Sequence, residues 1–150
     1  MKFNGYLVGV LGDGLTKETD KWTRQSENRK ALEVRIIRSA EIVFAEKGYS
    51  GSSMESIAVI ADISKQNLIY YFPSKEALYK RVLKEILDIW IERLTFLETQ
   101  GDTPDEIIRG YVSEKLKLSR LYPNASKVFA HEIISGAPLM KEYLISHLKP

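Results

Sequence analysis

Three polar side chains able to read DNA bases stand next to one another at Lys65, Gln66 and Asn67. Gln and Asn can each form two hydrogen bonds to the edge of an adenine, and Lys can donate to the acceptor atoms of a guanine. Tyr70 and Tyr71 follow a short distance along the chain, and tyrosine hydroxyls can bond to phosphate oxygens. These residue types, in this order, indicate a nucleic-acid interface.

Two short helices joined by a tight turn would have to position these side chains. Ser52 and Glu55 have the spacing of a capping box, which predicts the start of the first short helix. Ser64 can cap the second, which runs over residues 65–71. Together with the longer helix expected over residues 27–48, they predict a helix-turn-helix, whose second helix enters the major groove.

The rest of the chain has helical periodicity, with apolar residues three and four positions apart. It predicts helices over residues 74–100, 103–122 and 124–135, and another from residue 139 onward. Thr103 and Glu106 form a capping box at the second of these starts. That helix carries a stripe of apolar residues, namely Ile107, Tyr111, Val112, Leu116 and Leu118. No strand pattern competes, so the sequence predicts an all-α protein.

Several motifs in the first half resemble the DNA-binding module of TetR-family regulators. They occupy residues 44–49, 57–58, 61–64 and 68–78. The resemblance implies that Lys65, Gln66 and Asn67 face the bases, and that Tyr70 and Tyr71 pack on the sugar–phosphate backbone.

The same resemblance implies phosphate contacts for Ser53, at the start of the first short helix, and Lys75, at the start of the fourth helix. Helix N-termini also favour anions, which agrees with these roles. The chain departs from the family pattern at two positions. Asp62 stands where the family usually has Gly, although Asp tolerates left-handed backbone geometry, and Ile69 occupies a position that is often aromatic.

The glycine-rich start of the sequence and the resemblance together suggest a domain organisation. A flexible extension is expected over residues 1–26, and a helix-turn-helix DNA-binding domain over residues 27–77. A long fourth helix would join it to a helical ligand-binding and dimerisation domain over residues 78–150. Family members normally continue through several further helices, so this second domain is expected to be truncated.

A basic stretch precedes the reading helices. Between Arg24 and Arg38 there are five basic residues and two acidic ones, a local charge of +3. Such a segment could follow the phosphates and add salt-sensitive affinity that does not depend on sequence. A solvated helix face is the alternative interpretation.

Residues 86–90, 122–126 and 136–139 resemble the branch of the TetR family that regulates pyrimidine utilisation, which implies uracil or thymine as the effector. Glu132 lies on or beside an apolar face, and a buried carboxylate needs a ligand N–H group or a cation as its partner. Arg93 is similarly placed on the fourth helix. The alternative to a ligand role is that Glu132 and Arg93 pair with each other or with neighbouring helices. Trp90, Tyr122 and Phe129 could wall a flat pocket, or pack in the core.

Composition excludes several other classes of protein. The 150 residues carry 22 basic and 20 acidic side chains, no cysteine and two histidines, His131 and His147. There is no disulfide framework and no thiolate zinc site, and we find no nucleophile–base pair or nucleotide-binding loop. No enzyme activity, metal site or cofactor is therefore expected. No apolar run reaches 18 residues, which excludes a transmembrane helix, and a cytoplasmic protein without membrane association is expected.

The leading hypothesis is a ligand-responsive transcriptional repressor that binds a roughly palindromic double-stranded DNA operator as a homodimer. One alternative is a TetR-type regulator of an unrelated small molecule. The other is a truncated helical interaction module that has no effector response and binds protein. The salt dependence of DNA binding would separate the DNA-binding hypotheses from the protein-binding one.

Overall fold

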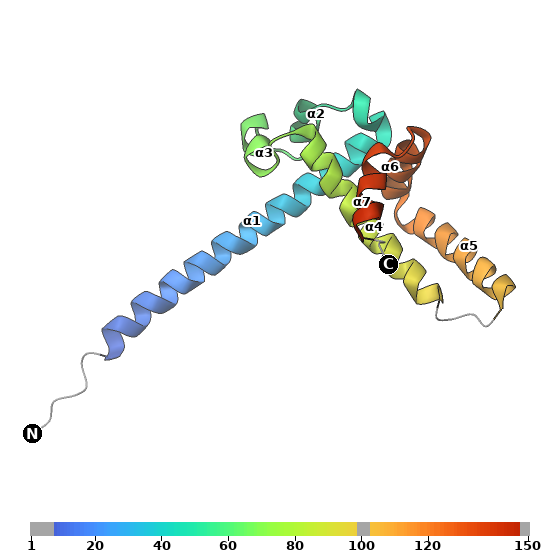
Figure 1. The fold of residues 1–150 in the computed structure, drawn as a ribbon. Helices are drawn as coiled ribbons and strands as arrows, with labels where there is room; N and C mark the ends of the chain where they lie inside the picture. The colour runs from blue at the N-terminus through green and yellow to red at the C-terminus, as the bar shows by residue number, and fades with distance from the viewer. Residues whose placement is uncertain (1–7, 99–102, 148–150) are drawn as a thin grey trace, which may run out of the picture. The chain divides into compact units, whose positions relative to one another are not determined.

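The computed structural model describes residues 8–98 and 103–147, and every regular element in these two stretches is a helix (Figure 1). The helices are α1 (Val8–Gly51), α2 (Met54–Ile60), α3 (Lys65–Tyr71), α4 (Lys75–Glu98), α5 (Pro104–Leu121), α6 (Pro123–Ile134) and α7 (Pro138–His147). The all-α prediction is confirmed, and each predicted helix after the first begins within two residues of its expected position. No helix in the described residues is both long and apolar enough to cross a membrane.

The chain divides into two units, residues 1–35 and 36–150. In the first unit, α1 is already helical from Val8, whereas the sequence predicts a flexible extension up to residue 26. No proline interrupts residues 8–47, and the glycines there weaken a helix without breaking it. The helical geometry is interrupted at Gly48, whose φ of 68° and ψ of 177° are non-helical, at the position where the sequence predicts the end of the first long helix. Side chains 18–31 are all exposed, so local hydrogen bonds rather than packing hold this helix. Residues 1–7 lie outside the described residues.

The second unit has a core built from the apolar stripes of α1, α2, α3 and α4. Helix α4 also contacts α5, α6 and α7, and so joins the two parts of this unit. The stripe expected on α1 is confirmed, since its members from residue 36 onward are buried. The largest fully buried side chains are Phe44, Ile36, Ile57, Leu68, Leu78, Ile86, Val43, Val82 and Val128.

The start of α2 differs by one residue from the prediction. Ser53, not Ser52, caps the helix, and its Oγ accepts a hydrogen bond from the Ser56 backbone N–H at 3.1 Å. The Ser56 hydroxyl completes the capping box in place of Glu55. Ser52 is buried, and its hydroxyl donates to the Gly48 carbonyl at 2.5 Å. The sequence pattern could not separate two adjacent serines, because only tertiary packing decides which one is buried.

Other local predictions are confirmed. Ser64 caps α3 by accepting from the Asn67 N–H at 3.1 Å, and Thr103 and Glu106 form the predicted capping box of α5. Asp62 has φ 52°, the left-handed geometry that replaces the family glycine. These features depend on residues within a few positions of one another, so the sequence contains the information they need.

The apolar stripe of α5 is largely exposed. Of its five residues only Leu118 is buried, while Val112 and Leu116 are 51% and 55% exposed. Helix α5 contacts α4 and α6, which together cover only one side of it. Among the described residues, no other helix covers most of the apolar stripe of α5.

Candidate DNA interface and effector region

Helix α3 presents the predicted base-reading residues to solvent. Leu68 is fully buried and fixes the helix to the core, which leaves Lys65, Gln66 and Asn67 exposed on the first turn. Lys65 forms an ion pair with Glu55 of α2. The hydrogen bond from Lys65 lowers the pKa of the Glu55 carboxyl below its ordinary value. The structure thus places three polar side chains together at the N-terminal end of an exposed short helix.

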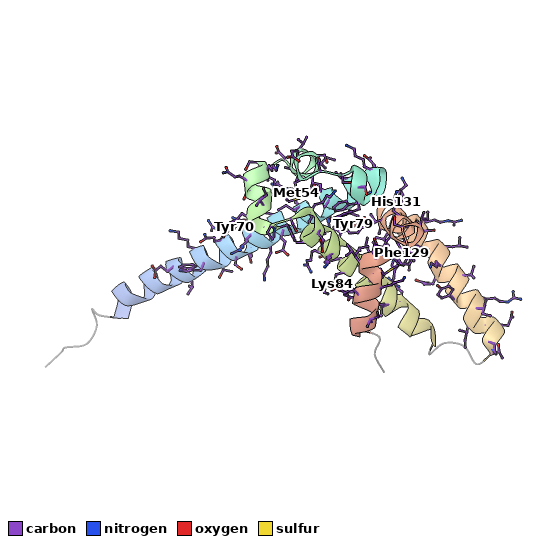
Figure 2. The ribbon with its side chains drawn as sticks, turned by 45° about the horizontal axis from the view of Figure 1, so that its top comes forward. Met54, Tyr70, Tyr79, Lys84, Phe129 and His131 are labelled. Carbon is purple, nitrogen blue, oxygen red and sulfur yellow. The ribbon has the colours of Figure 1, made fainter. Side chains whose placement is uncertain are left out.

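The two tyrosines at the end of α3 also lie together. Their rings meet edge to face with centroids 5.5 Å apart. Tyr70 is 71% exposed and projects from the helix (Figure 2), whereas Tyr71 is half-buried. Ile69, the position that departs from the family pattern, is exposed beside them. Tyr70 is therefore the more accessible of the two to a nucleic-acid backbone.

Ser53 and Lys75 lie at the two helix starts where phosphate contacts are expected. Ser53 is exposed while it caps α2. The Lys75 ammonium donates to the backbone carbonyls of Tyr49 at 2.8 Å and Ser52 at 3.0 Å, and sits 4.4 Å from the centre of the Tyr49 ring. An ammonium has three N–H donors, so one remains for a phosphate oxygen while the other two hold the turn between α1 and α2.

Glu132 is 3% exposed, and its carboxylate accepts three hydrogen bonds. Its Oε1 accepts from the backbone N–H groups of Leu139 at 2.8 Å and Met140 at 3.0 Å, and its Oε2 accepts from the Tyr79 hydroxyl at 3.0 Å. Glu132 and Arg93 do not pair with each other; each contacts neighbouring helices instead, which is the other form of the predicted structural alternative. Arg93 instead lies 3.8 Å from a carboxylate oxygen of Glu114 on α5.

Aromatic side chains from α4 and α6 meet close to Arg93. The rings of Trp90 and Phe129 have centroids 4.2 Å apart, and the Lys115 ammonium lies 5.4 Å and 5.2 Å from them. Trp90 is buried, as in the core-packing interpretation. Tyr122, expected beside these rings, is 39% exposed at the start of α6. The structure therefore brings together two of the three predicted pocket aromatics.

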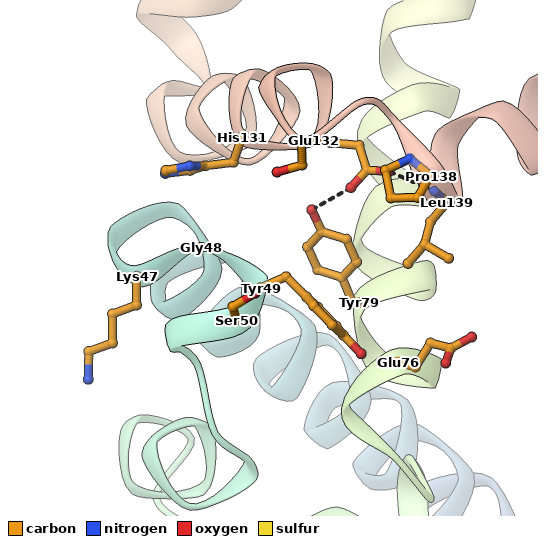
Figure 3. A pocket seen from close by; sticks show the side chains of 11 residues that line it. Lys47, Gly48, Tyr49, Ser50, Glu76, Tyr79, His131, Glu132, Pro138 and Leu139 are labelled. Atoms are coloured by element: carbon orange, nitrogen blue, oxygen red, sulfur yellow. Dashed lines mark hydrogen bonds between the residues drawn. The ribbon is translucent and has the colours of Figure 1, made fainter.

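A cavity of about 460 Å³ opens between the end of α1, the start of α4, and α6 and α7 (Figure 3). Tyr49, Tyr79, His131 and Glu132 are among its lining residues. Of the five predicted ligand residues only Glu132 lines this cavity. Burial, and then the nearby Glu132 carboxylate, raise the pKa of the Tyr79 hydroxyl well above its ordinary value, so Tyr79 stays a proton donor.

Sequence reasoning missed Tyr79, Tyr49 and Lys115. Tyr79 occupies a core position in the periodic pattern of α4, which gives no sign that its hydroxyl meets a carboxylate 53 residues later. Tyr49 and Lys115 contribute through their positions in the folded chain, and no local motif marks them.

Two family models together match the whole of the second unit. Residues 36–82 match the model of the bacterial regulatory proteins of the tetR family, and residues 83–150 match that of the C-terminal region of YcdC-like proteins. The chain belongs to the TetR family. The resemblance found in its motifs is thereby confirmed.

Curated relatives of this TetR-family chain carry regulator names. It is 42% identical over 139 residues to the HTH-type transcriptional regulator RutR of Escherichia coli, an alignment that covers 93% of this chain and 64% of RutR. It is 41% identical over 75 residues to the uncharacterised HTH-type transcriptional regulator YuxN of Bacillus subtilis, over 50% of this chain and 26% of YuxN. The chain thus spans less than two thirds of the length of these relatives.

Solved structures share the fold. A TetR-like transcriptional regulator from a Rhodococcus species superposes with a TM-score of 0.68 at 24% identity, covering 77% of this chain and 62% of that one. A mutant form of HlyIIR superposes with a TM-score of 0.63 at 25% identity, covering 77% and 65%. The helical arrangement is therefore that of TetR-type regulators.

Proposed function

We propose that this chain is a DNA-binding transcriptional regulator that reads duplex DNA with α3. The observation that carries the proposal is the exposure of Lys65, Gln66 and Asn67 around the buried anchor Leu68. A short helix held by one core residue, with polar side chains on its first turn, fits the way a recognition helix enters the major groove. Ser53, Tyr70, Tyr71 and Lys75 would then hold the phosphate backbone.

Salt dependence tests this proposal. We expect affinity for a random-sequence duplex to fall steeply with salt, because Lys and Arg contacts release counterions from DNA. Replacing Lys75, the expected phosphate contact, with Met should reduce the slope of log affinity against log salt by about 1. Lys127→Met, on the exposed side of α6, is the matched control and should leave the slope unchanged. A shallow slope in the parent chain would favour the protein-binding alternative.

We further propose that the regulator is a repressor that acts as a homodimer in the cytoplasm, where its operator DNA lies. Dimeric readers of this type bind half-sites about 34–36 Å apart, or multiples of that distance. Effector binding that shifts α4 would change the separation of the two reading helices and release the operator. The family membership and the name of RutR as a transcriptional regulator support this proposal.

A pyrimidine base such as uracil or thymine is the proposed effector, by resemblance of residues 86–90, 122–126 and 136–139 to a pyrimidine-utilisation regulator. Trp90 and Phe129 offer aromatic rings, and Lys115 an ammonium donor for a ring carbonyl. Arg93 and Tyr122 would flank the site and Glu132 would support it from α6. An unrelated small molecule is the alternative effector.

Tryptophan fluorescence can test the effector directly. Trp22→Phe leaves Trp90 as the single tryptophan, and we expect its emission to change on titration with uracil or thymine. Lys115→Met should weaken this response. If neither base changes the emission, the effector is not a pyrimidine bound at this aromatic pair.

A further inference from the structure

We propose that Glu132, in the effector half, positions the turn between α1 and α2 in the DNA-reading half. It acts through Tyr79, Tyr49 and Lys75, and is a positioning residue for DNA binding. The inference rests on the proposed function only in assigning that turn a role at the phosphate backbone. The coupling itself is carried by contacts within residues 36–150.

The path begins at the Glu132 carboxylate, which holds two elements at once. One carboxylate oxygen accepts hydrogen bonds from the first free N–H groups of α7, those of Leu139 and Met140. The other oxygen accepts a hydrogen bond from the Tyr79 hydroxyl of α4. Because Glu132 is almost fully buried, loss of a hydrogen-bond partner is costly, and each hydrogen bond constrains its donor. A movement at the start of α7 therefore also moves the acceptor of Tyr79.

The second step is an aromatic cluster. Tyr79 is 2% exposed and lies beside Tyr49 (Figure 3), with 4.9 Å between the two ring centroids. The ring centroid of Phe44 lies 4.8 Å from that of Tyr79. Close-packed rings in a core have few alternative rotamers, so a displacement of one ring is passed to the next. Tyr49 is the residue of this cluster that lies nearest to α2 in sequence.

The third step joins Tyr49 to the start of α2. The Lys75 ammonium lies over the Tyr49 ring and donates to the Tyr49 and Ser52 carbonyls. The Ser52 N–H in turn donates to the Tyr49 carbonyl at 3.3 Å. Ser53, the cap of α2 and an expected phosphate contact, follows directly. A continuous series of contacts therefore links α7 to the start of α2, where the proposed phosphate contact Ser53 lies.

This path differs from a pivot of α4 that changes the spacing of two reading helices. The path runs within a single chain and needs no second protomer. A ligand that displaces the 136–138 segment before α7 would reach the α1–α2 turn by this path. The prediction is that DNA affinity responds to Glu132 even in a single chain.

Tyr79→Phe tests the path, because it removes one hydroxyl and keeps the ring. Amide hydrogen exchange followed by NMR would report on the Ser52 and Ser56 N–H groups at the α1–α2 turn. We expect both to exchange about tenfold faster, the factor that corresponds to loss of one hydrogen bond to a charged group. Tyr143→Phe is the matched control, since the Tyr143 hydroxyl also bridges α7 to a carboxylate of α4, Asp88, but outside the path.

The Tyr122 N–H, which donates to the Leu118 carbonyl at 2.8 Å, separates coupling from general destabilisation. It lies at the end of α5, away from the path, and should keep the parent exchange rate. Equal acceleration of Ser52, Ser56 and Tyr122, or no acceleration at Ser52 and Ser56, would overturn the proposal.

DNA affinity provides a second measurement on the same variants. Tyr79→Phe should weaken binding to a random-sequence duplex several-fold more than Tyr143→Phe. If Ser52 and Ser56 respond but DNA affinity does not, then Glu132 does not position a DNA contact, and the inference fails at that step. If neither variant nor the parent chain binds DNA, the proposed function fails, and the exchange rates alone decide whether the coupling exists.

Discussion

Glu132 shows how much tertiary structure a single buried carboxylate can hold. Its three donors come from two helices, and two of them are backbone groups at the start of α7 that have no other helical partner. The carboxylate also carries negative charge to a helix N-terminus, where the helix dipole favours it. This one side chain therefore fixes α6 to α7 and to α4.

Glu132→Ala should destabilise the chain strongly. The substitution leaves the Tyr79 hydroxyl and two backbone N–H groups without acceptors, and we expect a loss of about 3 kcal/mol in the free energy of unfolding. Urea denaturation at neutral pH measures it. Glu142→Ala is the control, because Glu142 lies on α7 in an exposed ion pair with Lys80 and should change stability by less than about 1 kcal/mol. Equal effects of the two substitutions would contradict this account.

The predictability of individual residues follows the sequence distance of their partners. Ser64 and Asp62 could be assigned from the sequence because a cap and a left-handed turn involve neighbours only. Glu132 could be identified as a buried carboxylate, but not its partners, because Tyr79 lies 53 residues away. The sequence could not show whether Ser52 or Ser53 caps α2, because the burial of Ser52 depends on how α1 packs.

At the scale of elements, α2 is a helix of seven residues whose start serves two purposes. The Ser53 side chain caps it, and the same side chain is the proposed phosphate contact. A helix this short depends on its cap, because few internal hydrogen bonds hold it. A substitution that keeps the cap but adds a negative charge can separate the two roles of Ser53.

Ser53→Asp should keep α2 stable and weaken DNA binding. Asp is as good an N-cap as Ser, so the free energy of unfolding should stay within about 0.5 kcal/mol of that of the parent. Its negative charge would repel a phosphate, so affinity for duplex DNA should fall about tenfold. Ser53→Ala is the companion variant and should cost about 1 kcal/mol of stability. Unchanged DNA affinity in Ser53→Asp would remove Ser53 from the interface.

The contact between α1 and α4 contains a carboxylate pair. Burial, and then the nearby carboxylate of Glu85, raise the pKa of Glu41 above its ordinary value, although an N–H group of Ala125 at the start of α6 partly offsets them. A raised folded-state pKa means that the stability contribution is complete at pH values below the ordinary pKa. It is lost as pH rises through the folded-state pKa. Deprotonation of Glu41 therefore costs more free energy in the folded chain than in the unfolded chain.

Glu41→Gln should accordingly raise the melting temperature at pH 7. The increase should shrink as pH falls below about 4.5, where Glu41 is protonated in both folded and unfolded chains. Thermal denaturation followed by circular dichroism at pH 7 and pH 4 measures this. Glu46→Gln, an exposed residue of α1 with the same charge change, is the control. A stabilisation that is equal at both pH values would show that the carboxylate repulsion is not its cause.

For the molecule as a whole, periodicity was sufficient to predict the number and order of the helices but not which faces are covered. The stripe on α1 is buried from Ile36 onward, whereas most of the stripe on α5 is exposed. Both stripes follow helical periodicity, so the sequence pattern alone could not distinguish them. Coverage depends on which other elements pack there, and a periodic pattern records only that a face is apolar.

The exposed face of α5 should make the chain self-associate. Ile108, Val112 and Leu116 lie four residues apart along this helix and are all more than half exposed. Contiguous apolar surface of this kind is uncommon on monomers and usually marks an interface. We expect sedimentation velocity to show a concentration-dependent shift to larger species. Val112→Lys should weaken the association about tenfold or more, because it places a charge in the middle of the stripe.

Val59→Lys gives a matched comparison, since Val59 is a 78% exposed valine on α2, outside this face. If self-association were non-specific hydrophobic contact between exposed apolar side chains, both substitutions would weaken it equally. If α5 forms a defined interface, only Val112→Lys acts, and random-sequence DNA should bind both variants with the affinity of the parent monomer. Self-association and DNA reading would then reside on different helices, which a dimeric regulator requires in order to hold two reading heads at once.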